Sequence, residues 1–193
     1  MGLDMYLTGK QYVSTYDHNL KDVQLQMMLK TVLKKWNMGN DKKQIDYPVQ
    51  YIEFQIMQWR KANQIHNWFV EKVQSGEDDC GWYYVSEQNC KDLLFVCEKV
   101  IANSTLVDGQ VQNGSTMSAE TGGKFVPNME QGKYIQNSAV AQETLPCSSG
   151  FFFGSEDYNE WYLDDIKETA TVLKKILDHD LFAHLEIYYS SSW

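Results

Sequence analysis

The sequence lacks any long apolar run and any recognisable leader segment. No stretch approaches the roughly 18 consecutive apolar residues with which a helix crosses a membrane. The opening residues Met1 to Asp4 show neither the basic start nor the apolar core of a secretory signal peptide. We therefore expect a chain that does not span a membrane and that works in the cytoplasm.

Motifs that fix a reaction are also missing. The sequence has no phosphate-binding loop, no dinucleotide-binding fingerprint and no glycine-flanked serine nucleophile. None of its four cysteines forms a Cys-x-x-Cys pair of the kind that binds zinc. We expect no cofactor, no metal and no catalytic residue from these patterns, and we interpret the cysteines as free thiols in a reducing compartment. They are Cys80, Cys90, Cys97 and Cys147.

An excess of positive charge is absent as well, because the net charge is −9. Such a charge repels both the nucleic-acid backbone and an anionic membrane surface. We therefore expect no nucleic-acid binding through a basic face and no membrane partner. What the chain does have is apolar content: 43% of its 193 residues are hydrophobic and 13% are aromatic. This length and composition predict a single domain, 1–193, with a real core.

Strand-like and helical periodicities alternate along the chain. Residues 49–56 read as a strand, because Ile52, Phe54 and Ile56 alternate with polar residues, although Pro48 could also stand in the first turn of a long helix. The pattern predicts an α+β fold: a small mixed β-sheet covered by about four helices. The expected elements are strands at 3–7, 49–56, 82–85, 151–153 and 184–189, and helices over 20–36, over 58–74, after the cap Ser86 and after Ser155 or Asp157.

Between 104 and 149 the composition shifts to Gly, Ser, Thr, Asn and Gln. A structureless loop of this length is uncommon inside a compact domain. We expect an inserted loop, a lid or a hairpin, with Lys124 to Val126 and Lys133 to Ile135 as candidate strands. A segment ordered by a partner is the remaining alternative.

The stretch from Trp59 to Val70 is the richest in distinctive side chains. Read as a helix, it places an apolar stripe on one side and a polar flank at the edge of that stripe, with Trp68 pointing away. The guanidinium of an arginine, the side-chain amides of asparagines and the imidazole of a histidine can all bind an oxygen-rich anionic ligand. A helix that starts just after a strand also favours an anion, because its first backbone amides are free. The candidate ligand-binding residues are Arg60, Asn63, His66, Asn67 and Trp68.

Four stretches together resemble a family of small uncharacterised proteins encoded by phages and prophage-bearing bacteria. The family has no established activity, so the resemblance implies a context, a product at work in a bacterial host cell, and assigns no site residue. The stretches are Met1-Gly-Leu-Asp-Met-Tyr-Leu7, 59–70, 151–163 and 189–193.

Three functional hypotheses remain. The first is an accessory protein that binds a small anionic ligand, such as a nucleotide signal of host defence. The second is a protein-interaction module that inhibits a host or phage protein, with Trp68 as the anchor, and self-association as a homodimer is open. The third is a nucleotide-directed hydrolase or transferase with His66 as general base and a metal on the acids that share one helix face. Those acids are Asp157, Glu160 and Asp164.

Overall fold

The computed structural model describes residues 2–16, 18–36, 48–118, 124–150 and 153–193. Across these ranges the chain forms five α-helices, one short 3-10 turn and six strands in two sheets. The α+β class is thereby confirmed. The first two residues of the strand expected at 151–153 lie outside the described residues, and Phe153 is not in a strand.

The central sheet has four strands in the order β2-β1-β6-β3. Every neighbouring pair in it runs antiparallel, so the expectation of a mixed sheet is wrong in this respect. Hydrophobic patterning predicts strands but not their relative direction, which depends on how the connections run. The strands are β1 (Asp4–Tyr12), β2 (Tyr51–Arg60), β3 (Tyr83–Val85) and β6 (Glu186–Ser192).

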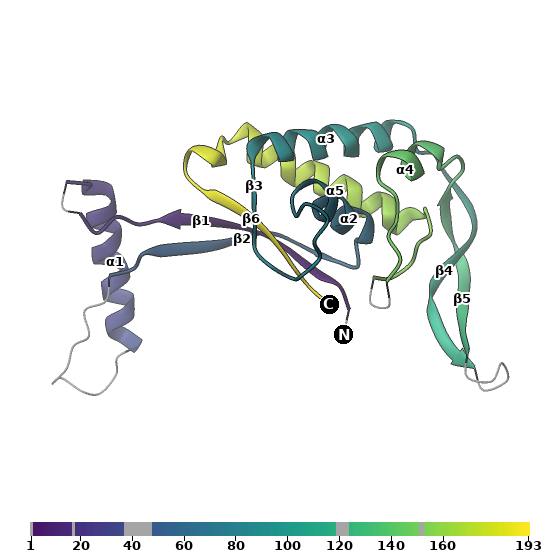
Figure 1. Ribbon diagram of the computed structural model, residues 1–193, viewed down its shortest axis with the longest axis horizontal. Helices are drawn as coiled ribbons and strands as arrows, with labels where there is room; N and C mark the ends of the chain where they lie inside the picture. The colour runs from purple at the N-terminus through teal and green to yellow at the C-terminus, as the bar shows by residue number, and fades with distance from the viewer. Residues whose placement is uncertain (1, 17, 37–47, 119–123, 151–152) are drawn as a thin grey trace.

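Three helices cover one face of the central sheet: α2 (Asn63–Lys72), α3 (Glu87–Ala102) and α5 (Glu160–Asp178) (Figure 1). Side chains alternate between the two faces of a strand, and those on this face are buried. They include Met5, Leu7, Trp59, Ile187 and Tyr189. In the part of the chain that the structure describes, no helix lies over the opposite face (Figure 1).

Local signals explain where α3 and α5 begin. Ser86 caps α3 as expected, and Asn89 completes a capping box with it. The thiols of Cys90 and Cys97 share the buried face of α3, and burial raises the pKa of each to about 12. Helix α5 begins later than expected, because Asn159 and not Ser155 or Asp157 is its cap.

The boundary between β2 and α2 differs from the prediction. The strand continues to Arg60, because Asp4 pairs with Arg60 and the amide of Lys61 still donates to the carbonyl of Leu3 at 2.8 Å. Lys61 then takes a positive φ of 62°, and the helix starts only at Asn63. The predicted boundary, with a strand ending at 56 and a helix starting at 58, was therefore wrong. Arg60 ends the strand and Lys61 directly precedes the N-cap Ala62, and the anion site expected there stays a prediction.

The molecule is elongated, because two elements extend beyond the helices at opposite ends (Figure 1). At one end β1 and β2 reach out to helix α1 (Leu20–Trp36). At the other end β4 (Leu106–Ser118) and β5 (Lys124–Ile135) form a separate two-stranded antiparallel sheet, followed by α4 (Ala139–Thr144). The 104–149 region thus folds as a hairpin, but both of its candidate strands belong to β5 and pair with β4, not with each other.

Candidate functional site

The five predicted ligand-binding residues do not share one surface. Arg60 ends β2 and is exposed, whereas Asn63, His66 and Trp68 are buried around α2 and Asn67 is half-buried. Consecutive residues of a strand point to opposite faces, so Arg60 lies on the face of the sheet opposite to Trp59 and to the helices. Arg60 and His66 therefore do not line one cleft.

His66 is part of an internal hydrogen-bond network. Its Nδ1 lies 2.7 Å from the hydroxyl of Tyr189, and its Nε2 lies 3.0 Å from a carboxylate oxygen of Asp78. The other oxygen of Asp78 accepts from the indole of Trp193 at 3.1 Å. Tyr189 is fully buried and stacks on Phe69 with ring centroids 4.0 Å apart, and burial holds its pKa well above the usual value.

An aspartate, a histidine and a hydroxyl in a line resemble a general-base relay. Here the hydroxyl belongs to Tyr189 in the core, and His66 has 1% of its surface exposed. Neither group is accessible to a substrate, because both side chains are buried. The network instead ties the last strand and Trp193 to the segment after α2.

Asn63 also serves the fold. Its side-chain amide donates to the carbonyls of Phe153 and Ser155 at 3.1 and 2.8 Å, and its oxygen accepts from the amide of Ser148 at 2.9 Å. Both donors and one of the two acceptor sites of the Asn63 side chain are thereby directed to the chain's own backbone. This side chain fixes Ser148, Phe153 and Ser155 against the start of α2.

Trp68 does not point outward. It has 7% of its surface exposed and packs edge-to-face on Phe69 at 5.4 Å. Six of the ten residues of α2, Trp68 among them, are buried. The expectation that Trp68 anchors a partner from the surface was wrong for this reason.

The three acids near α5 are each engaged locally. Asp157 accepts from the amide of Gln112 at 3.2 Å, Glu160 accepts from the amide of Lys133 at 3.2 Å, and Asp164 pairs with Lys167 at 3.3 Å. The first two hold the base of the β4–β5 hairpin to α5. Within the described ranges, no group of three His, Cys, Asp or Glu side chains converges as a metal site.

Comparisons with models of protein families, with curated proteins and with solved structures give no match. The resemblance to phage proteins therefore stays a prediction. A function for this chain has to be argued from its own surface.

The uncovered side of the central sheet carries exposed rings. Trp82 and Tyr84 have 52% and 55% of their surface exposed, and Tyr12 and Tyr51 are exposed to a similar extent. Tyr84 is paired with Tyr188 and Tyr12 with Tyr51, and alternation along the strands keeps these rings on one side. We call this surface the aromatic face: Tyr12, Tyr51, Trp82, Tyr84 and Tyr188.

The rings of the aromatic face are held in place by one another. Tyr188 contacts Tyr84 and Trp82 at centroid distances of 5.9 and 6.5 Å, and the two rings at the other end of the face lie 5.6 Å apart. The ammonium of Lys10 lies 4.2 Å from the ring centre of Trp82 and 3.0 Å from Glu53. These contacts pre-position large amphipathic side chains, which is what an interaction surface needs.

The sequence contained a partial signal for this surface. The run from Trp82 to Tyr84 is unusual in its aromatic content, and strand alternation predicts that Trp82 and Tyr84 share one face. What the sequence could not show is that this face stays uncovered, because that depends on all the helices packing on the other side.

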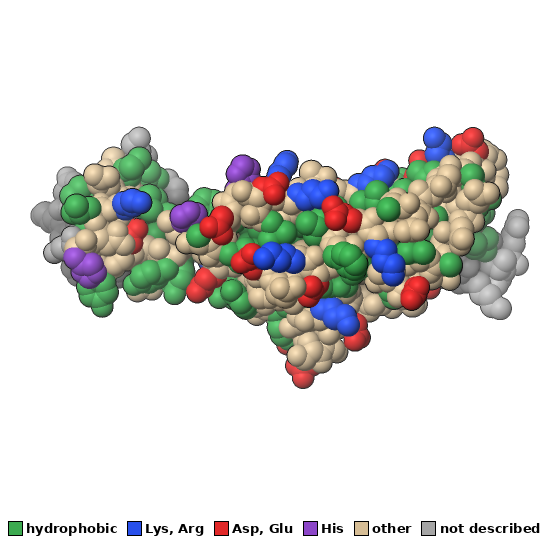
Figure 2. All heavy atoms as spheres, turned by 90° about the horizontal axis from the view of Figure 1, so that it is seen from above, with side chains coloured by type: hydrophobic (Ala, Val, Ile, Leu, Met, Phe, Trp, Pro, Cys, Tyr) green, Lys and Arg blue, Asp and Glu red, His purple; other side chains and the backbone are tan. Residues whose placement is uncertain are grey.

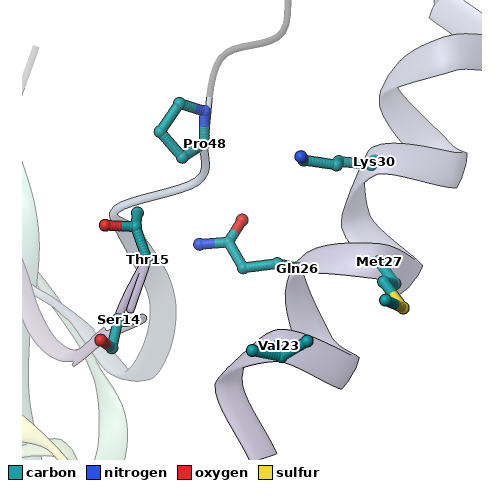
Figure 3. A pocket seen from close by; sticks show the side chains of 7 residues that line it. All are labelled: Ser14, Thr15, Val23, Gln26, Met27, Lys30 and Pro48. Carbon is teal, nitrogen blue, oxygen red and sulfur yellow. The ribbon is translucent and has the colours of Figure 1, made fainter. Parts of the chain in front are cut away.

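A small pocket lies where α1 meets the segments next to β1 and β2 (Figure 3). Its volume is about 220 Å³, and Gln26 projects into it from α1 toward the opposite strand ends. The side chain of Gln26 is already bonded twice to the backbone of Val49, at 2.6 and 3.1 Å. The pocket is lined by Ser14, Thr15, Val23, Gln26, Met27, Lys30 and Pro48, and none of the five residues predicted to bind a ligand is among them.

Proposed function

We propose that this chain is a protein-interaction module and that it binds a protein partner across the aromatic face. The observation that carries the proposal is a sheet whose one face is buried under three helices while the other presents clustered, half-exposed rings. Exposed aromatic side chains gathered on one side of a folded domain mark interaction sites. Tyrosine and tryptophan give a large contact area with little loss of side-chain freedom, and they dominate protein-binding surfaces.

The charges near the aromatic face favour a protein over a nucleic acid. Lys10 is paired with Glu53, and Glu186 accepts from the hydroxyl of Tyr188 at 3.1 Å. Rings alone can stack on bases, but binding a strand also requires a positive groove that follows the phosphates. The net charge of −9 opposes such a groove.

The small-ligand hypothesis has less support. Of the residues offered for it, Asn63 and His66 are bonded to other parts of the chain, and Arg60 lies on the opposite side of the sheet from them. The hypothesis of a partner encoded by a bacterial host or a phage rests on the resemblance of the sequence alone.

The experiment compares partner capture by three proteins. The purified chain is immobilised and exposed to extract from infected bacterial cells, and bound proteins are identified by mass spectrometry. The double variant Trp82→Ser with Tyr84→Ser is expected to lose the partner that the unmodified chain retains. Phe95→Ser is the matched control, because Phe95 is 69% exposed on α3, on the helix-covered side of the sheet.

The control variant is expected to retain the partner as the unmodified chain does. Circular dichroism and thermal melting establish that both variants are folded. Capture that is equal for the double variant and the unmodified chain contradicts the proposal.

A further inference from the structure

Helix α1 stands away from the rest of the molecule with apolar side chains in solvent. Leu20 and Met28 have 73% and 69% of their surface exposed, and Met27 and Val32 are exposed too. Figure 2 shows hydrophobic side chains gathered at the end of the molecule that α1 forms, while acidic and basic side chains alternate over the helices seen from above. The hydrogen bonds that anchor α1 run from Asp22 and Gln26 to the segments next to β1 and β2.

A helix of 17 residues gains little stability from its own hydrogen bonds in water. In folded proteins most helical stability comes from packing one apolar side against another surface. The exposed apolar side of α1 lacks such packing within the described residues of one chain. A second surface that covers it is therefore the natural source of its stability.

Charge indicates what kind of surface this is. Helix α1 contains four lysines and one aspartate, a net charge of +3, whereas the whole chain is −9, which leaves −12 for the remainder. An apolar helix with this charge is complementary to an acidic surface that carries apolar side chains. The aromatic face combines apolar rings with a small excess of negative charge, since Glu53 and Glu186 border its rings and outnumber Lys10, which lies between them.

We propose that the partner at the aromatic face is a second copy of this chain, and that α1 of each copy packs across the aromatic face of the other. This inference rests on the interaction module proposed above and names its partner. Met27 and Met28 supply flexible thioethers, which pack favourably against rings such as those of Trp82 and Tyr84. The resulting dimer has twofold symmetry and contains the same helix-on-sheet contact twice.

Two other arrangements are disfavoured. Two α1 helices packed on each other bring two charges of +3 together. Helix α1 cannot cover the aromatic face of its own chain, because the paired strands β1 and β2 carry it beyond the end of that face (Figure 1). The hydrogen bond from the amide of Val13 to the carbonyl of Gln50 at 2.9 Å continues that pairing up to α1.

The test uses the full chain and two complementary variants. The helix variant carries Met27→Asp and Met28→Asp, and the face variant carries Trp82→Ser and Tyr84→Ser. Sedimentation equilibrium from about 1 to 100 µM is expected to show a dimer for the unmodified chain and for Phe95→Ser. Each double variant is expected to raise the dimer dissociation constant at least about tenfold.

Mixing the two double variants is the decisive step. The helix variant keeps an intact aromatic face and the face variant keeps an intact α1, so the mixture regains one of the two contacts. We expect a heterodimer in the mixture at concentrations where each variant alone is monomeric. A mixture that stays monomeric overturns the inference.

Other outcomes overturn it in distinguishable ways. A dimer formed by the face variant alone indicates helix-on-helix contact, and a dimer formed by the helix variant alone indicates sheet-on-sheet contact. If the unmodified chain is monomeric throughout, the second copy is not the partner. If the chain then captures a different protein and this capture requires Trp82 and Tyr84, the proposed interaction module still holds without the dimer. If capture does not require these two residues, both the interaction module and the dimer are contradicted.

Discussion

Helices α1 and α2 place their side chains in opposite ways. Six of the ten residues of α2 are buried, and three of those are the polar residues Asn63, Gln64 and His66. On α1 the apolar residues Met27 and Met28 are among the most exposed. The polarity of a side chain therefore does not decide its burial here; the segments that pack around each helix do.

The difference has a physical consequence. A buried polar group is costly unless its hydrogen bonds are satisfied, so the surroundings of α2 had to supply partners from distant parts of the chain. Exposed apolar side chains lower the stability of a single chain only slightly, and covering them with a second surface is favourable because it removes them from water. The buried, hydrogen-bonded polar side chains around α2 thus stabilise the fold, whereas the exposed apolar side chains of α1 are available for binding.

Among changes to hydrogen-bonded polar side chains, the largest effect is expected in the interior beside α2. Asn63→Ala removes three hydrogen bonds and leaves the carbonyl of Ser155 and the amide of Ser148 with a lost partner. We expect a loss of about 2–4 kcal/mol in the free energy of unfolding, measured by urea denaturation. Asn67→Ala, one turn further along α2 at a half-buried position, is the matched control with a loss below about 1 kcal/mol. Equal losses at both positions contradict the role assigned to Asn63.

The second prediction concerns the carboxyl that faces α2. Burial raises the pKa of Asp165 to about 6, and the amide of Gln64 at 3.4 Å only partly offsets this. A carboxyl whose pKa is higher in the folded chain than in the unfolded chain lowers stability as the pH rises from about 4 to about 6. Above this pH range the full loss of stability is reached, and below it the carboxyl no longer lowers the stability.

Asp165→Asn removes the titrating group and keeps the shape. We expect the variant to be more stable than the unmodified chain by about 1–3 kcal/mol at pH 7.5. The gain is expected to shrink as the pH falls toward 4 and to disappear below that, where the carboxyl becomes protonated in both the folded and the unfolded chain. Thermal melting as a function of pH measures it, and a gain that does not change with pH shows a packing effect instead.

Much of the fold was predictable from local patterns. The helix from Leu20 to Trp36, the cap at Ser86 and the strand before it follow from spacing and capping chemistry. The end of β2 was not predictable in this way, since it depends on Asp4 pairing with Arg60 from a distant strand. Pairing with β1 extends β2 over residues 58–60, which local periodicity assigns to a helix.

The site was less predictable than the fold. Asn63 and His66 are chemically able to hold an anion. Their availability depends on Asp78, Tyr189 and Ser148, which lie outside the local sequence pattern. The exposure of Trp82 and Tyr84 depends equally on which face of the sheet the helices cover. Side-chain chemistry is local, whereas access to solvent is a property of the whole fold.

A smaller effect is expected where α1 is attached. Gln26→Ala removes both hydrogen bonds to the backbone of Val49. We expect faster amide hydrogen exchange across 20–32, by about tenfold or less, with no change over α3 and α5. Gln24→Ala, an exposed glutamine two residues earlier, is the control and leaves the exchange unchanged. Faster exchange throughout the chain contradicts a purely local anchor.

The smallest effect on stability is expected at the exposed surface of α1 itself. Met28→Ser removes apolar surface that is already in solvent, so at concentrations where the chain is monomeric we expect the free energy of unfolding to change by less than about 0.5 kcal/mol. Met57, which is 5% exposed in the central sheet, provides the contrast, because Met57→Ser is expected to cost about 2–5 kcal/mol. Urea denaturation of both variants at low concentration measures the difference. A large loss for Met28→Ser in the monomer shows that α1 packs within its own chain, which removes the reason for expecting a partner there.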